Sequence, residues 1–272
     1  YFGATKATVS AATATSLTVT VPTGATFQPI TVTNTTTGIT AASAIPFKVT
    51  FTGGGNSKYY STSEIKVSGQ NTPYGVTIGD FNLDGKPDVV QAAYGSNTIN
   101  ILKNTATSGT LGASSFDATL WKAAGTNPNY PIAVDVDGDG LLDIVVSNRN
   151  STTISVYRNT STPGGTSITF DNQQTYGTGT SPVGVAAGDL DGDGKPEIVV
   201  ANQGTNGTAS TISVFYNQSV SGAAFGSTTF ATQVTFNVNQ QPTGIALGDI
   251  DGDGKLDIVV ANQSTNSNNI SL

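Results

Sequence analysis

The sequence predicts an all-β protein made of β-propeller blades, four of them visible, preceded by part of a β-sandwich. A block with an Asp-rich loop recurs four times, with its first aspartates 55, 54 and 60 residues apart. Its segments are short, β-branched and bounded by Gly, Asn and Ser, and no window has the 3.6-residue period and caps of a helix. A row of repeated sandwiches is the rival fold, but the same acidic loop in each copy favours radial repetition.

The opening segment, residues 1–52, does not share the repeat. Its stretches TKATVSAA, SLTVTVP, PITVTNTT and FKVTF alternate as sandwich strands do. The segment is short for an independent sandwich, so we expect its opening strands to be missing. Residues 53–59, which begin with three glycines, are expected to form a linker.

Residues 60–272 contain the repeat, which divides into units 60–115, 116–169, 170–229 and an incomplete 230–272. Each unit is expected to have four strands, which in the third copy are GVAAGDL, EIVVAN, TISVFYN and FATQVTF. A proline lies seven residues before each acidic loop, and an aromatic residue lies 12 or 13 residues before that proline. These landmarks are Pro73, Pro128, Pro182 and Pro242, with Tyr60, Phe116, Phe170 and Phe230. We expect both ends of the chain to be cut.

Four acidic loops carry the chemistry. Acidic loops 1 to 4 are DFNLDGKPD (80–88), DVDGDGLLD (135–143), DLDGDGKPE (189–197) and DIDGDGKLD (249–257). Oxygen-bearing side chains occupy positions 1, 3, 5 and 9, and Gly occupies position 6. The pattern is similar to the first half of an EF-hand loop, in which side chains at 1, 3 and 5 and the carbonyl at 7 bind Ca²⁺. Here a carboxylate at position 9 is expected to close the shell.

We therefore expect about four Ca²⁺ ions, one per acidic loop. The predicted side-chain ligands are Asp80, Asn82, Asp84 and Asp88; Asp135, Asp137, Asp139 and Asp143; Asp189, Asp191, Asp193 and Glu197; and Asp249, Asp251, Asp253 and Asp257. The predicted carbonyl ligands are those of Lys86, Leu141, Lys195 and Lys255. Loop 1 has Asn82 in place of an acid and lacks Gly at position 4, so this site is expected to bind more weakly.

The composition supports a hard cation and excludes other chemistry. The 272-residue chain has a net charge of -7, and 15 of its 18 acidic residues lie at predicted ligand positions. Carboxylates packed together repel one another unless a cation neutralises them. The absence of Cys and His excludes thiol and imidazole catalysis and the usual zinc sites. The alternative is that the loops are solvated Asp-Gly turns, which require neither four fixed spacings nor four copies.

The motif D-x-D-G-D-G-x-x-D-I-V-V-A-N followed by T-I-S-V resembles FG-GAP/VCBS-like repeats, the calcium-loop propeller repeats of integrin α-subunits. The resemblance covers about residues 60–272. It implies blades of a larger ring, because integrin-type propellers have seven. Val134 departs from the pattern, since the other copies have Gly79, Gly188 and Gly248 there. Residues 1–52 resemble the later strands of an IPT/TIG immunoglobulin-like domain. The pairing implies a large secreted or surface-anchored bacterial protein.

We expect a calcium-stabilised, non-enzymatic extracellular module of a bacterial surface adhesin or filament. Three acids lie outside the loops, Glu64, Asp117 and Asp171. Asp117 and Asp171 occupy equivalent positions one blade apart, which is too far for a catalytic carboxylate pair. The alternative is an accessory propeller of a secreted glycan-degrading enzyme or lectin.

Partner binding is expected at Asn-, Ser- and Thr-rich loops on the rim opposite the acidic loops, at 147–152, 201–210 and 261–269. Their amides and hydroxyls can recognise a protein or a glycan, and solvated turns are the alternative for each loop. Trp121 and Tyr130 are candidate aromatic contacts, with core or edge packing as the alternative. Self-assembly of the chain with further copies of itself is a further alternative. An acidic chain without basic clusters or a long apolar run predicts neither nucleic-acid binding nor membrane insertion.

Overall fold

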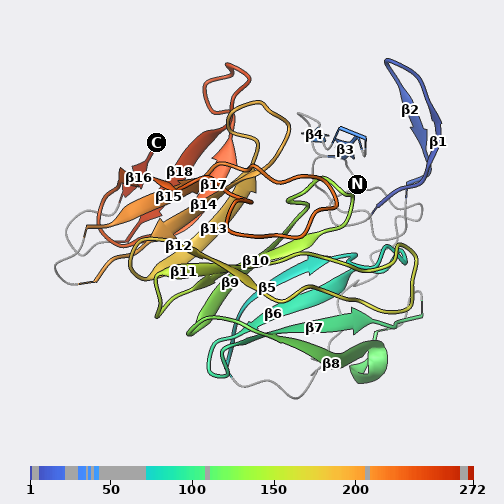
Figure 1. The fold of residues 1–272 in the computed structure, drawn as a ribbon, viewed down its shortest axis with the longest axis horizontal. Helices are drawn as coiled ribbons and strands as arrows, with labels where there is room; N and C mark the ends of the chain where they lie inside the picture. The colour runs from blue at the N-terminus through green and yellow to red at the C-terminus, as the bar shows by residue number, and fades with distance from the viewer. Residues whose placement is uncertain are drawn as a thin grey trace, which may run out of the picture.

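The computed structural model describes residues 1, 6–21, 30–34, 36–37, 40–42, 72–107, 111–205, 209–263 and 269–272. These residues form an all-β structure in which antiparallel sheets, one for each copy of the repeat, stand next to one another (Figure 1). A single 3₁₀ turn, Ala113–Ser115, is the only helical element in these ranges. None of the described residues belongs to a helix that is long and apolar enough to cross a membrane.

Each sheet has the same meander order, so every strand pairs with the next one along the chain. The first sheet contains β5 (Pro73–Gly79), β6 (Asp88–Ala93), β7 (Thr98–Asn104) and β8 (Phe116–Ala123). The second contains β9 (Pro128–Val134), β10 (Asp143–Asn148), β11 (Thr153–Tyr157) and β12 (Gln174–Gly177). The third contains β13 (Pro182–Gly188), β14 (Glu197–Asn202), β15 (Thr211–Phe215) and β16 (Val234–Asn237). The fourth contains β17 (Pro242–Gly248), β18 (Asp257–Asn262) and β19 (Asn269–Ser271).

The landmark prolines begin the first strand of each sheet, and three landmark aromatics, Phe116, Phe170 and Phe230, lie on the fourth-strand side. Phe116 begins β8, which pairs with β7. Phe170 and Phe230 form isolated bridges with Asn159 and Asn217. Each sheet therefore extends past the start of the next sequence unit, and the sequence units are offset from the sheets.

The second strands of the second and third sheets are buried on both faces because each lies between two neighbouring sheets. In β10, Ile144 and Val146 pack towards the first sheet, whereas Val145 packs towards the third. All six residues of β10 and of β14 are buried. This explains why DIVVSN and EIVVAN are continuous apolar runs without the alternation of a half-exposed strand.

Apolar clusters between successive sheets hold these sheets together. Phe81 and Ile99 of the first sheet meet Tyr157 of the second in one cluster, and Phe81 contacts Phe170 with ring centroids 5.6 Å apart. A second cluster joins the second and third sheets, and a third joins the third and fourth. Each fully buried side chain of this size contributes about 1.5–3 kcal/mol.

The described part of the amino-terminal segment forms two small ladders. One pairs β1 (Val9–Ala12) with β2 (Leu17–Val19), and the other pairs β3 (Thr31–Thr33) with β4 (Thr40–Ala42). The Tyr1 hydroxyl donates to the carbonyl of Gly140, and the N–H of Thr40 donates to the carbonyl of Gly194 at 3.0 Å. These residues thus contact acidic loops 2 and 3. The predicted strand FKVTF, the linker 53–59 and the landmark Tyr60 lie outside the described residues.

Candidate metal centres

Each acidic loop connects the first and second strands of its sheet, as the repeat predicts. The last residue of the first strand pairs with position 9 of the loop, as in Gly79 with Asp88 and Gly188 with Glu197. Position 9 is therefore the first residue of the second strand, and the loop closes back on its own base.

Glycine at position 6 has the left-handed backbone that the pattern predicts. Its φ is between 86° and 88° in all four loops, at Gly85, Gly140, Gly194 and Gly254. Position 4 is also left-handed and is glycine in loops 2 to 4. In loop 1 this position is Leu83, with φ 57°, a conformation that a Cβ atom disfavours.

Backbone amides organise the carboxylates within each loop. The position 1 carboxylate accepts from the N–H of position 6 at 2.9–3.0 Å in all four loops. The position 9 carboxylate accepts from the N–H of position 2 at 2.8–3.1 Å. These bonds place both ends of the loop in the same geometry in every copy.

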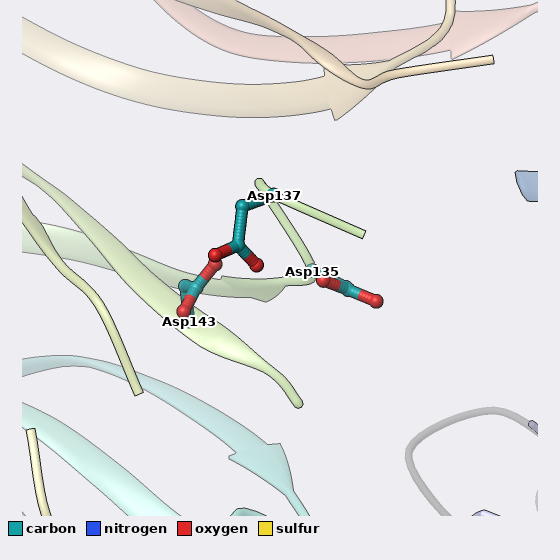
Figure 2. Close-up of side chains that lie close together, drawn as sticks. All are labelled: Asp135, Asp137 and Asp143. Carbon is teal, nitrogen blue, oxygen red and sulfur yellow. The ribbon is translucent and has the colours of Figure 1, made fainter. Parts of the chain in front are cut away.

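Positions 1, 3 and 9 come together as three-carboxylate groups in loops 2, 3 and 4. In each group the carboxylate oxygens lie within 4.8 Å of one another. Figure 2 shows the group of loop 2, in which the carboxylates of Asp137 and Asp143 are turned towards one another and Asp135 lies to one side. The three groups are Asp135, Asp137 and Asp143; Asp189, Asp191 and Glu197; and Asp249, Asp251 and Asp257.

Position 5 is not part of these groups. Its carboxylate accepts from the N–H of position 7, at 2.8–3.0 Å in all four loops. The full predicted set, with position 5 and the carbonyl of position 7 as further ligands, stays a prediction. The residues concerned are Asp84, Asp139, Asp193 and Asp253, with Lys86, Leu141, Lys195 and Lys255.

Loop 1 is the one acidic loop in which the residues at positions 1, 3 and 9 are all buried. Asp80 is 1% exposed, and Asn82 and Asp88 are fully buried. The Asn82 side-chain amide donates to Asp84 Oδ2 at 3.2 Å and to the carbonyl of Gly165 at 2.6 Å, while its Oδ1 has no hydrogen-bond donor. In loop 2, Asp135 Oδ1 is likewise buried without a donor.

Burial raises the pKa of several loop carboxylates. It raises the pKa of Asp80 to about 6 and that of Asp88 to about 7, against backbone hydrogen bonds that lower both. It raises the pKa of Asp135 to about 7, with the neighbouring charge of Asp139 as the next cause. The pKa of Asp143 is well above its usual value for the same reason. The charged forms are therefore unfavourable in these loops unless a cation neutralises them.

The donor set fits a hard divalent cation. All candidate side-chain atoms are carboxylate or amide oxygens, which are the ligands of Ca²⁺ and Mg²⁺. The orphaned, buried oxygens of Asn82 and Asp135 are acceptors that a cation would satisfy. Within the described residues, three-carboxylate groups of this kind occur in acidic loops 2, 3 and 4, which are successive copies of the same loop.

Asparagines behind acidic loops 1, 2 and 3 were not among the residues predicted from the sequence. The N–H of Asn159 donates to Asp143 Oδ1 at 2.8 Å, and its side-chain amide donates to the carbonyls of Phe81 and Leu142, both at 2.8 Å. Asn104 and Asn217 contact Asp88 and Glu197 in the same way. The final Asn of TINILKN, TISVYRN and TISVFYN was the signal available in the sequence.

Position 3 joins each of the first two loops to the next sheet. The carbonyl of Asn82 accepts from the N–H of Gly164 at 2.7 Å. Asp137 Oδ2 accepts from the N–H of Gly222 at 3.1 Å. Loops 1 and 2 thus contact turns of the second and third sheets, in addition to the strands of their own sheets.

The residues predicted outside the loops are mostly exposed. Asp117 and Asp171 are exposed, and Glu64 lies outside the described residues. Trp121 lies on β8 and is 62% exposed, and Tyr130 lies on β9 and is 43% exposed. Residues 147–152 include the last two residues of β10 and the turn to β11, at the end of the second sheet opposite its acidic loop. Residues 201–210 and 261–269 are described only in part.

A family model of the FG-GAP-like repeat matches three overlapping stretches, residues 80–146, 135–200 and 198–260. Each stretch includes at least one acidic loop, and together they cover about two thirds of the chain. No curated protein matches the chain significantly.

Proposed function

Because this chain belongs to the FG-GAP-like repeat family, we propose that it is a calcium-binding, non-enzymatic module of an extracellular bacterial adhesin or filament. The observation that carries this proposal is the repeated grouping of positions 1, 3 and 9 in loops 2 to 4. A solvated turn does not require three carboxylates to converge in successive copies, whereas a bound cation does.

The residues at positions 1, 3, 5 and 9, with the carbonyl of position 7, would hold the ion in each loop. When bound, Ca²⁺ supplies positive charge that neutralises the converging carboxylates. The backbone of the loop orients the ligands, since the N–H of position 2 donates to the carboxylate of position 9 and the N–H of position 6 donates to that of position 1. The left-handed glycine at position 6 permits the turn.

Calcium in loops 1 and 2 would join neighbouring blades as well as neighbouring strands. The position 3 residues Asn82 and Asp137 contact the turns that contain Gly164 and Gly222 in the following sheets. An ion that immobilises position 3 therefore also stabilises the packing between sheets. With a dissociation constant of about 10⁻⁵ M, about 1 mM calcium adds on the order of 2.7 kcal/mol per site.

The wider architecture follows from the same family. FG-GAP repeats are typical of extracellular proteins, where calcium concentrations suit sites of this strength. We further propose that the four sheets belong to a larger propeller ring and that residues 1–52 belong to an IPT/TIG immunoglobulin-like domain. The loops opposite the calcium sites would then be available to a ligand, and an accessory role beside a glycan-degrading enzyme or lectin is the second candidate.

Calorimetric titration with calcium and thermal melts with and without chelator test the proposal. We expect close to four ions per chain and a large fall of the melting temperature in chelator. The variants Asp135→Asn and Asp189→Asn should each remove one ion, whereas the control Asp171→Asn should leave the count unchanged. Absence of calcium binding, or binding that leaves the melting temperature unchanged, would contradict the proposal.

A further inference from the structure

The ends of the sheets opposite the acidic loops combine a constant backbone with variable side chains. The residue after each second strand donates its N–H to the carbonyl of the residue before the landmark proline, at 2.9–3.1 Å in all four sheets. The side chains at this equivalent position nevertheless differ from sheet to sheet. They are Tyr94, Arg149, Gln203 and Gln263.

Three tyrosines gather at this end of the first two sheets. The Tyr74 ring lies 5.7 Å from the Tyr94 ring and 5.8 Å from the Tyr130 ring, which it meets edge to face. Tyr74 is 51% exposed and Tyr130 is 43% exposed. The cluster therefore presents aromatic surface to solvent.

Tyr130 departs from the repeat at a position where glycine is otherwise used. The equivalent residues in the other copies are Gly75, Gly184 and Gly244. A Cβ at Gly75 would collide with the carbonyl of Asn129, and one at Gly184 would lie 2.9 Å from the carbonyl of Thr243. Close packing of the first strands thus favours glycine here, and packing does not account for the exposed tyrosine.

Arg149 lies between the tyrosines and the third sheet. Its Nη1 is 3.5 Å from the Tyr74 hydroxyl, and its Nη2 donates to Gln203 Oε1 at 3.2 Å. Within the described residues its guanidinium forms no ion pair, in contrast to Arg158. The described acids all lie at the acidic-loop ends: Asp117 on β8 lies opposite Lys103 on β7, and the N–H of Asp171 donates to the carbonyl of Arg158 beside loop 2.

We propose that Tyr74, Tyr94, Tyr130, Arg149 and Gln203, here called the tyrosine–arginine patch, bind a carbohydrate that carries a carboxylate group. Exposed tyrosine rings offer flat apolar faces for the C–H groups of a sugar ring and hydroxyls for its polar edge. A guanidinium without an acidic partner can bind a carboxylate through two hydrogen bonds. The amide of Gln203 supplies both a donor and an acceptor for sugar hydroxyls.

The patch distinguishes this ligand from other anions. One arginine, without neighbouring basic residues in the patch, is too little charge for a nucleic acid, whose binding depends on several phosphate contacts. The acidic loops lie at one end of the sheets and Arg149 lies at the other. An anionic ligand at Arg149 is therefore far from the negative charge of the loops. This ligand would extend the proposed function, and it depends on that function only because calcium is proposed to stabilise the fold that carries the patch.

The test uses the full chain in saturating calcium and two acidic probes, sialyllactose and a glucuronate-containing tetrasaccharide. Their neutral counterparts are lactose and the carboxyl-reduced tetrasaccharide. We expect at least one acidic probe to bind about tenfold or more tightly than its neutral counterpart, the size expected for a charge-assisted contact. Arg149→Gln, which introduces the residue of the third copy, should abolish this preference. Tyr130→Gly, which restores the glycine of the repeat, should weaken binding of both forms.

Trp121→Ala is the matched control, because Trp121 is an exposed aromatic residue on the outer strand β8. It should leave affinity unchanged, and all three variants should retain the wild-type calcium-dependent melting. The proposal is overturned if neither acidic probe binds, if acidic and neutral probes bind equally, or if only a poly-glutamate peptide binds. A chain that binds the sugar but no calcium would instead contradict the proposed metal function alone.

Discussion

Arg158 lies against Asp137, with Nε 2.8 Å from Oδ2, and it reaches a second carboxylate of the same loop, Asp139 Oδ2, at 2.7 Å. The arginine side chain is 13% exposed and that of Asp137 is fully buried. The equivalent residues in the first and third copies are Lys103 and Tyr216. Acidic loop 2 therefore contains a cation of its own at positions 3 and 5, which the other described copies lack.

Replacing Arg158 with tyrosine, the residue of the third copy, should strengthen calcium binding in loop 2. It should also lower the free energy of unfolding of the metal-free protein. The guanidinium competes for Asp137 and Asp139, and its removal leaves their charges uncompensated until calcium binds. For this partly buried pair we expect a loss of about 1–3 kcal/mol in chelator. Calorimetry and melts with and without calcium measure both effects.

Lys103→Tyr is the control for this prediction, since the Lys103 ammonium donates to the carbonyl of Thr166 and to no loop carboxylate. It should change calcium affinity little. A weaker loop 2 site in Arg158→Tyr would show that the guanidinium supports the ion rather than competing with it.

Leu83→Gly should stabilise the chain. Leu83 has φ 57° at position 4 of loop 1, where the other loops have glycine. A left-handed backbone costs an L-residue about 1–2 kcal/mol, and the greater chain entropy of glycine offsets about half of that. We expect a net gain of about 0.5–1 kcal/mol and tighter calcium binding in loop 1, measured by denaturant unfolding and calorimetry. An unchanged or lower unfolding midpoint would contradict this expectation.

Most of the strand and loop pattern could be predicted from the sequence because it is local and repeated. The strands after each loop are continuous β-branched runs, and the left-handed glycine of position 6 follows from the Asp-Gly spacing. The convergence of positions 1, 3 and 9 in loops 2 to 4 also follows from spacing within one loop.

Contacts between copies could not be predicted in this way. The bond from Asn159 to the carbonyl of Phe81 joins residues 78 positions apart, and the bond from the N–H of Gly222 to Asp137 joins residues 85 positions apart. Such contacts depend on how sheets stack, which a single repeat does not encode. The landmark aromatics Phe116, Phe170 and Phe230 open a sequence unit but lie on the fourth-strand side of the preceding sheet, so their order in the chain did not indicate where a sheet ends.

Asn159→Ala should destabilise the interface between the first two sheets. Its side-chain amide donates to Phe81 of the first sheet and to Leu142 of the second. Alanine leaves both buried carbonyls without a donor, which costs about 2–4 kcal/mol. Asn150→Ala is the control, because the Asn150 side chain is exposed and, among the described residues, donates only to Asn127 Oδ1. Equal unfolding midpoints for the two variants would contradict a role for Asn159 between the sheets.

Gly75→Ala and Gly244→Ala form a matched pair at equivalent positions of the first and fourth copies. A Cβ at Gly75 would collide with the backbone carbonyl of Asn129 and come within 2.8 Å of Pro131, whereas none of the described atoms lies within 4 Å of a Cβ at Gly244. The backbone of β9 cannot yield without disturbing its pairing with β10, so we expect Gly75→Ala to cost about 3 kcal/mol. Gly244→Ala should change stability by less than about 1 kcal/mol, because alanine loses less chain entropy than glycine and meets no obstacle. Thermal melts in calcium compare the two variants directly. Similar losses in both would mean that close approach of the first strands is not what requires glycine at this position.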